Sequence, residues 1–156
     1  MKKLTLIAVS LFLGYISVAQ SLKVPAASPA QTVKQDFGLS SVEINYSRPG
    51  VKNRVIFGDI VPYNVVWRTG ANAATTITFG DTVMVGGVKV SPGKYGLLSV
   101  PGEKEWSIII SRSTSVTSPD AYKQEDDVVR YKTVPIALST KVETFTIQLD
   151  KVKPAS

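Results

Sequence analysis

Three turn signals in the middle of the chain constrain its fold more than any other feature. Gly86-Gly87 supplies two residues that accept positive φ, as a tight primed turn requires. Ser91-Pro92-Gly93 and Pro101-Gly102 combine a Pro, which fixes φ, with a Gly that accepts positive φ. The strand-like runs beside these turns cover residues 83–85, 88–90, 94–100 and 105–111. Three successive hairpins predict an antiparallel meander.

Strand patterns also stand before and after this meander. Val42, Ile44 and Tyr46 alternate with polar residues, which is the period of a half-buried strand. The stretch 62–78 reads as strand, corner and strand, with Val65, Val66 and Trp67 in the first strand. Two further strands are expected at 128–134 and 143–149, where Phe145, Ile147 and Leu149 would face inward.

One short helix is predicted near residues 118–125, where Ser118, Pro119 and Asp120 have the order of a helix start. No amphipathic run of ten or more residues lies between the strands. The sequence therefore predicts an all-β fold, an antiparallel β-sandwich of about eight or nine short strands. Tyr46, Trp67 and Trp106 are expected in its core.

The first residues have the pattern of a secretory signal peptide. Lys2 and Lys3 precede an apolar run from Leu4 to Ile16, and small residues follow up to Ala19. We therefore expect a signal peptide at 1–19, an irregular leader or edge segment at 20–36, one sandwich domain at 37–150 and a tail at 151–156. The mature protein would begin at Gln20, be exported to the periplasm or secreted, and carry no integral membrane span.

Composition removes many kinds of chemistry. The chain contains neither His nor Cys, which excludes Ser-His-Asp triads, thiol nucleophiles and His-based metal sites. Loss of Lys2 and Lys3 with the signal peptide lowers the formal net charge from +6 to +4, and the remaining basic residues are scattered. Nucleic-acid binding is therefore not expected. No catalytic residue, metal site or cofactor is predicted.

Three weaker patterns have simpler structural interpretations. Glu125-Asp126-Asp127 offers oxygen ligands for Ca²⁺, but adjacent acids of an extended chain cannot all converge on one ion. Asp59 and Asp81 form a conceivable hydrolase pair whose separation the sequence does not fix. Thr82 lies in Asp81-Thr82-Val83, which resembles an O-glycosylation acceptor of some exported bacterial proteins and equally fits a hairpin loop.

One group of residues is a candidate ligand site. Planar guanidinium forks bind carboxylate, phosphate or sulfate oxygens in pairs, and aromatic faces stack on sugars. The candidate ligand-binding residues are Arg48, Arg54, Tyr63, Arg68 and Asn72. The structural alternative is that the arginines bind main-chain carbonyls or acids. Trp67 and its neighbour Arg68 cannot line one pocket unless the strand bends between them.

Several motifs carry a family resemblance: Tyr46-Ser47-Arg48-Pro49, Arg54, Phe57-Gly58, Pro62-Tyr63, Trp67-Arg68-Thr69-Gly70-Ala71-Asn72, Thr75-Thr76 and Pro92-Gly93-x-Tyr95. From about residue 28 to 149 the chain resembles an uncharacterised family of exported bacterial proteins, domain of unknown function 2911. Such proteins commonly have Gly before the second arginine, where this chain has Asn53. The resemblance implies an exported β domain and supplies no activity.

Three functional hypotheses follow. The first is an exported, non-enzymatic binding module for a small anionic or carbohydrate ligand, or for an envelope protein, through the arginine group. The second is a structural or interaction domain with no small-molecule site. The third is a hydrolase that works with acids and without His. Arginine forks that converge on an open pocket would favour the first hypothesis, and forks bonded to the protein itself would favour the second.

Overall fold

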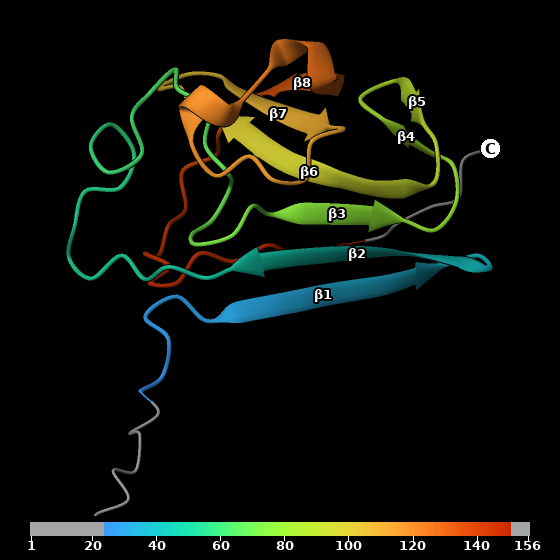
Figure 1. Cartoon of the computed structure of the whole chain (residues 1–156). Coiled ribbons are helices and arrows are strands. Elements are labelled where there is room, and N and C mark those ends of the chain that lie inside the picture. Colours follow the sequence, from blue (N-terminus) through green and yellow to red (C-terminus); the bar gives the residue numbers. More distant parts are fainter. Residues whose placement is uncertain (1–23, 151–156) are drawn as a thin grey trace, which may run out of the picture.

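The computed structural model describes residues 24–150, and their regular structure is almost entirely antiparallel β (Figure 1). A six-stranded sheet has the order β1-β2-β3-β6-β7-β8, and β4 and β5 form a separate two-stranded sheet. The strands are β1 (Ala30–Phe37), β2 (Ser40–Ser47), β3 (Thr76–Phe79), β4 (Val83–Val85), β5 (Val88–Val90), β6 (Gly93–Val100), β7 (Trp106–Ser111) and β8 (Asp127–Thr133). The predicted antiparallel all-β fold is confirmed.

The first two strands form a long hairpin at one edge of the large sheet. β1 pairs with β2 along its whole length, from Ala30 opposite Ser47 to Phe37 opposite Ser40. A two-residue turn joins them, and its Gly38 has a φ of 55°. The sequence prediction placed an irregular leader or edge segment at 20–36, and in the structure regular pairing begins at Ala30. β1 therefore belongs to the sheet as its edge strand.

The predicted meander is correct in two of its three hairpins. β4 pairs with β5 across Gly86-Gly87, and β6 pairs with β7 across the turn that contains Pro101-Gly102. The third prediction is wrong, because β6 pairs with β3 and not with β5. Ser91-Pro92-Gly93 bends the chain from the small sheet back into the large one. A turn signal fixes a change of direction, but it does not fix the strand that becomes the partner.

Hydrophobic side chains fill the space on both faces of the sheet. On one face, Val42, Ile44 and Phe79 pack with Val83 and Val90 of the small sheet. Side chains of the C-terminal segment 143–149 pack against the same cluster. On the opposite face of β6 and β7, Leu98 and Ile109 form a second cluster with Val116 of the connection between β7 and β8. The layers opposite the large sheet are therefore a short hairpin and irregular segments.

Two predicted strands and one helix differ from the structure. Residues 143–149 form no strand, because this segment packs against the face of the sheet, and an isolated bridge joins Thr144 to Gly50. Residues 65–67 also form no strand, and within the described residues Trp67 makes a single bridge, to Ser99. The short helix near 118–125 is present as two 3-10 turns, Pro119–Ala121 and Gln124–Asp126. No helix within residues 24–150 has the length and apolarity needed to cross a membrane.

Candidate functional site

A corner of the chain between Trp67 and Thr76 is held by its own side chains. The Trp67 indole N–H donates to the Gly70 carbonyl at 3.0 Å, and the Thr75 hydroxyl donates to the Thr69 carbonyl at 2.8 Å. Thr69 and Asn72 have positive φ angles of 55° and 59°. Such angles are uncommon for residues with a side chain and are kept only where the surrounding structure fixes them. The motif Trp67–Asn72 is therefore a tightly bonded turn.

This corner lies directly against the end of β2. A Cβ atom at Gly70 would lie 3.1 Å from the carbonyl oxygen of Ser47, so a larger residue would require the two segments to move slightly apart. Thr69 also reaches the hydroxyl of Ser99 on β6, at 2.9 Å. The two strongest family motifs, Tyr46–Pro49 and Trp67–Asn72, thus meet through their main chains.

Two of the predicted ligand arginines bind the main chain near the C-terminal segment. Arg48 donates from Nε to the Phe145 carbonyl at 3.1 Å and from Nη2 to the Thr146 hydroxyl at 2.9 Å. Arg54 donates from Nη2 to the Gly50 carbonyl at 2.8 Å and from Nε to the Val51 carbonyl at 3.1 Å. Arg48 therefore fastens residues 145–146 to the end of β2, whereas Arg54 closes its own turn.

The other three predicted ligand residues bind elsewhere. Arg68 donates from Nη1 to the carbonyl of Thr117, and its Nε is buried without a hydrogen-bond partner in the described part of the chain. The Asn72 amide donates to the Ser28 carbonyl at 3.1 Å. The ring of Tyr63 packs closely over Gly58. Arg48, Arg68 and Asn72 thus bond to distant segments of the chain, whereas Arg54 bonds within its own turn and Tyr63 packs over a nearby glycine.

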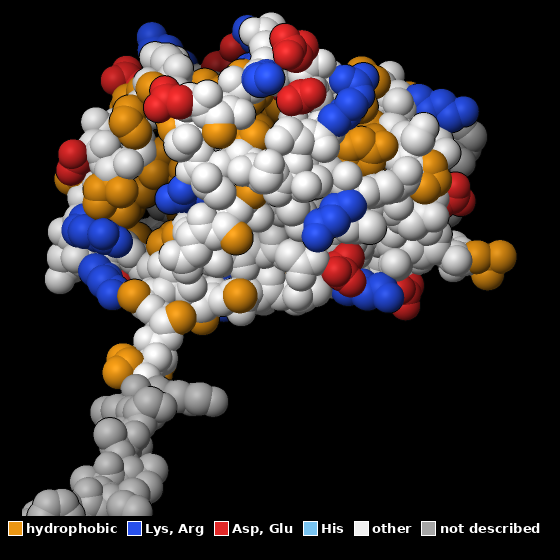
Figure 2. Space-filling model, in the orientation of Figure 1, with side chains coloured by type: hydrophobic (Ala, Val, Ile, Leu, Met, Phe, Trp, Pro, Cys, Tyr) orange, Lys and Arg blue, Asp and Glu red, His pale blue; other side chains and the backbone are white. Residues whose placement is uncertain are grey.

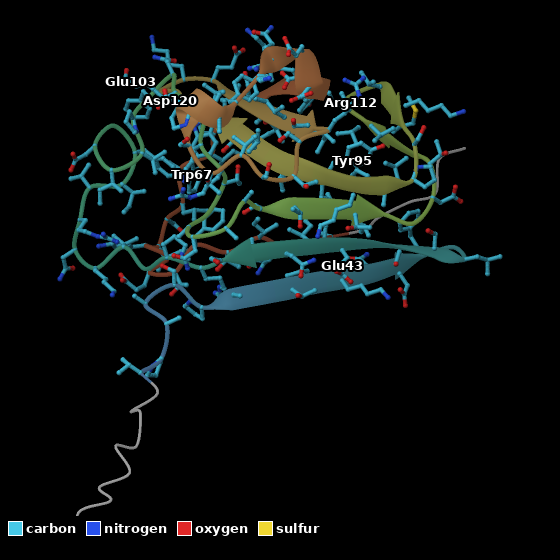
Figure 3. All side chains as sticks on the ribbon, in the orientation of Figure 1. Glu43, Trp67, Tyr95, Glu103, Arg112 and Asp120 are labelled. Atoms are coloured by element: carbon cyan, nitrogen blue, oxygen red, sulfur yellow. The ribbon has the colours of Figure 1, made fainter. Side chains whose placement is uncertain are left out.

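The predicted core aromatics belong to a continuous row of edge-to-face contacts. Ring centroids are 4.8 Å apart for Trp106 and Phe57, 6.0 Å for Phe57 and Trp67, and 5.2 Å for Trp67 and Phe145. Phe145 then meets Tyr46 at 5.7 Å. Tyr46 is fully buried, whereas both tryptophans are half-buried. Figure 3 labels Trp67 at the end of the sheet where these segments gather.

A shallow pocket of about 210 Å³ opens on the face of β1 and β2 that points away from the main core. It is lined by Ala30, Gln31, Thr32, Asn45, Tyr46, Ser47, Ala73 and Ala74. Strand alternation places Thr32, Asn45 and Ser47 on this face, since Ile44 and Tyr46 point into the core. The small side chains of Ala73 and Ala74 follow the corner described above and leave space beside the strands.

Hydrogen bonds connect the polar groups of this pocket to one carboxylate. The Thr32 hydroxyl donates to the Asn45 amide oxygen at 2.6 Å, and the Asn45 amide nitrogen donates to Glu43 Oε1 at 2.8 Å. Figure 3 shows Glu43 on β2. Of the described residues that line the pocket, none is charged. The nearby carboxylate opposes a bound anion, while hydroxyl and amide groups suit a ligand that both donates and accepts hydrogen bonds.

The polar face of β2 can be read from the sequence, but this pocket cannot. Alternation in residues 42–47 already indicated that Asn45 and Ser47 share a face. The missing information was the position of Ala73 and Ala74, which depends on how the corner folds back against β2. No local pattern in the sequence specifies that contact.

A second polar cluster joins the 3-10 turns to β8. The Tyr122 hydroxyl donates to Asp127 Oδ2 at 2.8 Å, and Arg130 forms an ion pair with the same carboxylate at 3.0 Å. Burial raises the pKa of Tyr122 above its ordinary value of 10.0, and the hydrogen bond and charge of Asp127 raise this pKa further. These bonds join the 3-10 turns to β8 and fix how the two elements lie against each other.

The weaker sequence patterns also receive positions in the structure. Asp81 accepts a hydrogen bond from the main-chain N–H of Thr82 at 2.6 Å within the turn before β4. Glu125 and Asp126 lie in the second 3-10 turn, and Asp127 begins β8. Within residues 24–150, no three acidic side chains gather to hold a metal ion.

Comparison with known proteins gives one match. The model of a family described as a protein of unknown function, DUF2911, matches residues 28–156. No curated protein and no solved structure matches the chain. Because the match covers most of the sequence and includes both motifs that meet at the corner, the chain belongs to the DUF2911 family.

Proposed function

We propose that this protein is an exported, non-enzymatic binding domain whose ligand is a small, neutral, polyhydroxylated compound, such as one sugar residue. The observation that carries the proposal is the pocket on β1 and β2, with its hydroxyl and amide side chains and its alanine wall. The proposal rests on this pocket and not on the arginine group, because Arg48, Arg54 and Arg68 each already donate to carbonyls or a hydroxyl of the protein.

The size of the pocket and the hydroxyl and amide groups in its lining support this class of ligand. Pockets for drug-sized ligands occupy about 300–1,000 Å³, so a volume of about 210 Å³ favours a single ring over a longer chain. Asn45 and Thr32 already orient each other by a hydrogen bond. The ligand therefore meets donors and acceptors that are fixed before it arrives, which lowers the entropy cost of binding.

Export is part of the same proposal. A signal peptide at 1–19 lies outside the described residues, so its support is the charge and hydropathy pattern of the sequence alone. We expect intact-mass measurement of the natural protein to show a chain that begins at Gln20, in the soluble periplasmic or secreted fraction. Recovery of the chain with Met1 in a membrane fraction would contradict this expectation.

Isothermal titration of the purified protein with a panel of neutral monosaccharides and disaccharides tests the binding site. Ala73→Leu fills the pocket from its exposed rim, and we expect it to weaken binding by about tenfold or more, which corresponds to about 1.4 kcal/mol. Ala137→Leu makes the same change at an exposed position outside the pocket and should leave affinity unchanged. The proposal fails if no sugar binds, or if both variants bind as the parent does.

A different observation favours a second candidate function, the binding of an envelope protein. The loop patch, defined as Val55, Phe57 and Ile60, exposes 65%, 38% and 48% of these residues. Figure 2 shows hydrophobic side chains gathered at the end of the molecule where Figure 1 draws this loop. Exposed apolar patches mark surfaces for protein partners. A photo-crosslinker at Ile60, compared with one at exposed Leu39, tests whether this patch contacts an envelope protein in cells.

A further inference from the structure

Among the described residues 24–150, β1 is a long edge strand. Within that part of the chain its eight residues pair only with β2, and the register from Ala30 to Phe37 contains no bulge. Edge strands expose unpaired N–H and C=O groups, and proteins commonly shorten, bend or cover such edges. Figure 1 shows β1 at the outer edge of the large sheet, where its main-chain groups on that side are available to another strand.

One hydrogen bond identifies which groups of β1 face outward. The Arg48 N–H donates to the Pro29 carbonyl at 2.9 Å, in the same register as the β1–β2 pairs. In an antiparallel ladder, hydrogen-bonded and non-hydrogen-bonded pairs alternate. Gln31, Val33 and Gln35 therefore bond to β2 through their main chains. The outward residues, whose N–H and C=O groups point away from β2, are Ala30, Thr32, Lys34 and Asp36.

We propose that a second copy of this chain binds this edge, with the two β1 strands antiparallel around a two-fold axis at Val33. This register places Thr32 opposite Lys34 and Ala30 opposite Asp36, so every outward residue meets another outward residue. All their N–H and C=O groups then find partners in a closed, symmetric pair. The two six-stranded sheets become one continuous sheet.

Side chains select this register among its neighbours. Val33 would pack against Val33 of the second copy, beside a core cluster that it already contacts. A shift of the axis to Lys34 would place two lysines directly opposite each other, which is destabilising. A shift to Gln35 would pair fewer of the outward residues. The Val33 axis therefore gives the most hydrogen bonds without placing like charges directly opposite each other.

The proposal is independent of the sugar site, although Ala30 and Thr32 contribute to both surfaces. Paired strands would extend one sheet face across the axis, so the two pockets would lie on the same face. A ligand that carries several sugar residues would then bind two pockets at once and gain avidity. A monomeric protein would remove this consequence and leave single-sugar binding intact.

Cysteine crosslinking tests the register, because the natural chain contains no Cys. At the proposed axis, Val33 of each copy forms a non-hydrogen-bonded pair with a Cα separation of about 4.5 Å, which a disulfide can span. We expect Val33→Cys to form a disulfide dimer on mild oxidation. Gln35→Cys is the matched control, because its opposite residue would be Gln31 and not another Cys. Equal crosslinking of the two variants would overturn the register.

Sedimentation equilibrium over a concentration series tests the dimer itself. Lys34→Pro removes one outward N–H, and edge strands accept Pro where the N–H faces solvent. We expect the parent to show twice the monomer mass and Lys34→Pro to lose the dimer, while Lys34→Ala keeps it. The proposal is wrong if the parent stays monomeric at every concentration. It is also wrong if folded Lys34→Pro, checked by circular dichroism, remains dimeric.

Discussion

The Tyr46 hydroxyl holds the C-terminal segment on the sheet, and Tyr46→Phe tests this role with the smallest possible change. The hydroxyl accepts a hydrogen bond from the Ile147 N–H at 3.0 Å and lies 3.4 Å from the carbonyl oxygen of the same residue. It also lies 3.3 Å from Gln31 Oε1. Tyr46 is only 4% exposed. Phe keeps the ring contact with Phe145, so the substitution removes only the hydroxyl that bonds to Ile147 and Gln31.

The expected loss follows from the groups that would be left without a partner. A buried main-chain group without a hydrogen bond costs about 1–3 kcal/mol. Ile147 is half-buried, so water can reach part of its main chain, and we expect a decrease of about 2 kcal/mol in the free energy of unfolding. For a domain of this size, such a decrease lowers the melting temperature by roughly 8 °C.

Urea denaturation of parent, Tyr46→Phe and Tyr131→Phe measures this difference. Tyr131 is 48% exposed and makes no hydrogen bond through its hydroxyl in the described residues, so its substitution is a matched control. Hydrogen exchange should also become faster at the Ile147 amide in Tyr46→Phe. An unchanged free energy of unfolding, or an equal loss in both variants, would refute the role assigned to this hydroxyl.

Three further predictions concern other contacts. Arg48→Lys should lower the free energy of unfolding by about 1–2 kcal/mol in urea, because Lys cannot reproduce both fork bonds to residues 145–146. Arg54→Lys, whose partners lie in its own turn, should lose less. The pKa of Tyr122 is raised in the folded state. The stability that this shift contributes is therefore complete below pH 10 and is lost as pH rises through the folded pKa. The melting temperature of the parent should therefore fall between pH 9 and pH 11, and it should fall less in Tyr122→Phe. Equal falls in the two proteins would contradict this prediction. Gly96→Ala would place a Cβ atom 2.2 Å from the Ser113 carbonyl oxygen, so we expect the free energy of unfolding to fall by more than about 3 kcal/mol, or the protein not to fold. Gly87→Ala meets no atom within 4 Å, and circular dichroism melts should show a smaller loss there.

Local patterns in the sequence determined the fold class and several of its turns. Alternation in residues 42–47 specified which face of β2 is buried, and Gly86-Gly87 specified the β4–β5 hairpin. The absence of His and Cys excluded thiol nucleophiles, His-dependent catalysis and His-ligated metals by composition alone. The inferences about strands and turns succeed because backbone sterics and strand alternation act over a few residues.

Contacts between distant segments were decided only by the tertiary structure. The alternation of Phe145, Ile147 and Leu149 correctly indicated an inward face, yet the segment lies across the sheet and forms no strand. Its main chain is bonded by Tyr46 and Arg48, which lie almost a hundred residues away.

The candidate site depended on the same kind of long-range contact. The sequence grouped the arginines by residue type and left open whether their forks face a ligand or the protein. In the structure, Arg48 and Arg68 bind main-chain carbonyls, while the pocket forms where Ala73 and Ala74 approach β2. A side chain's partner is set by the whole chain, because hydrogen-bonding groups of many residues compete for it as the chain folds. The residues beside it in the sequence constrain only its local direction.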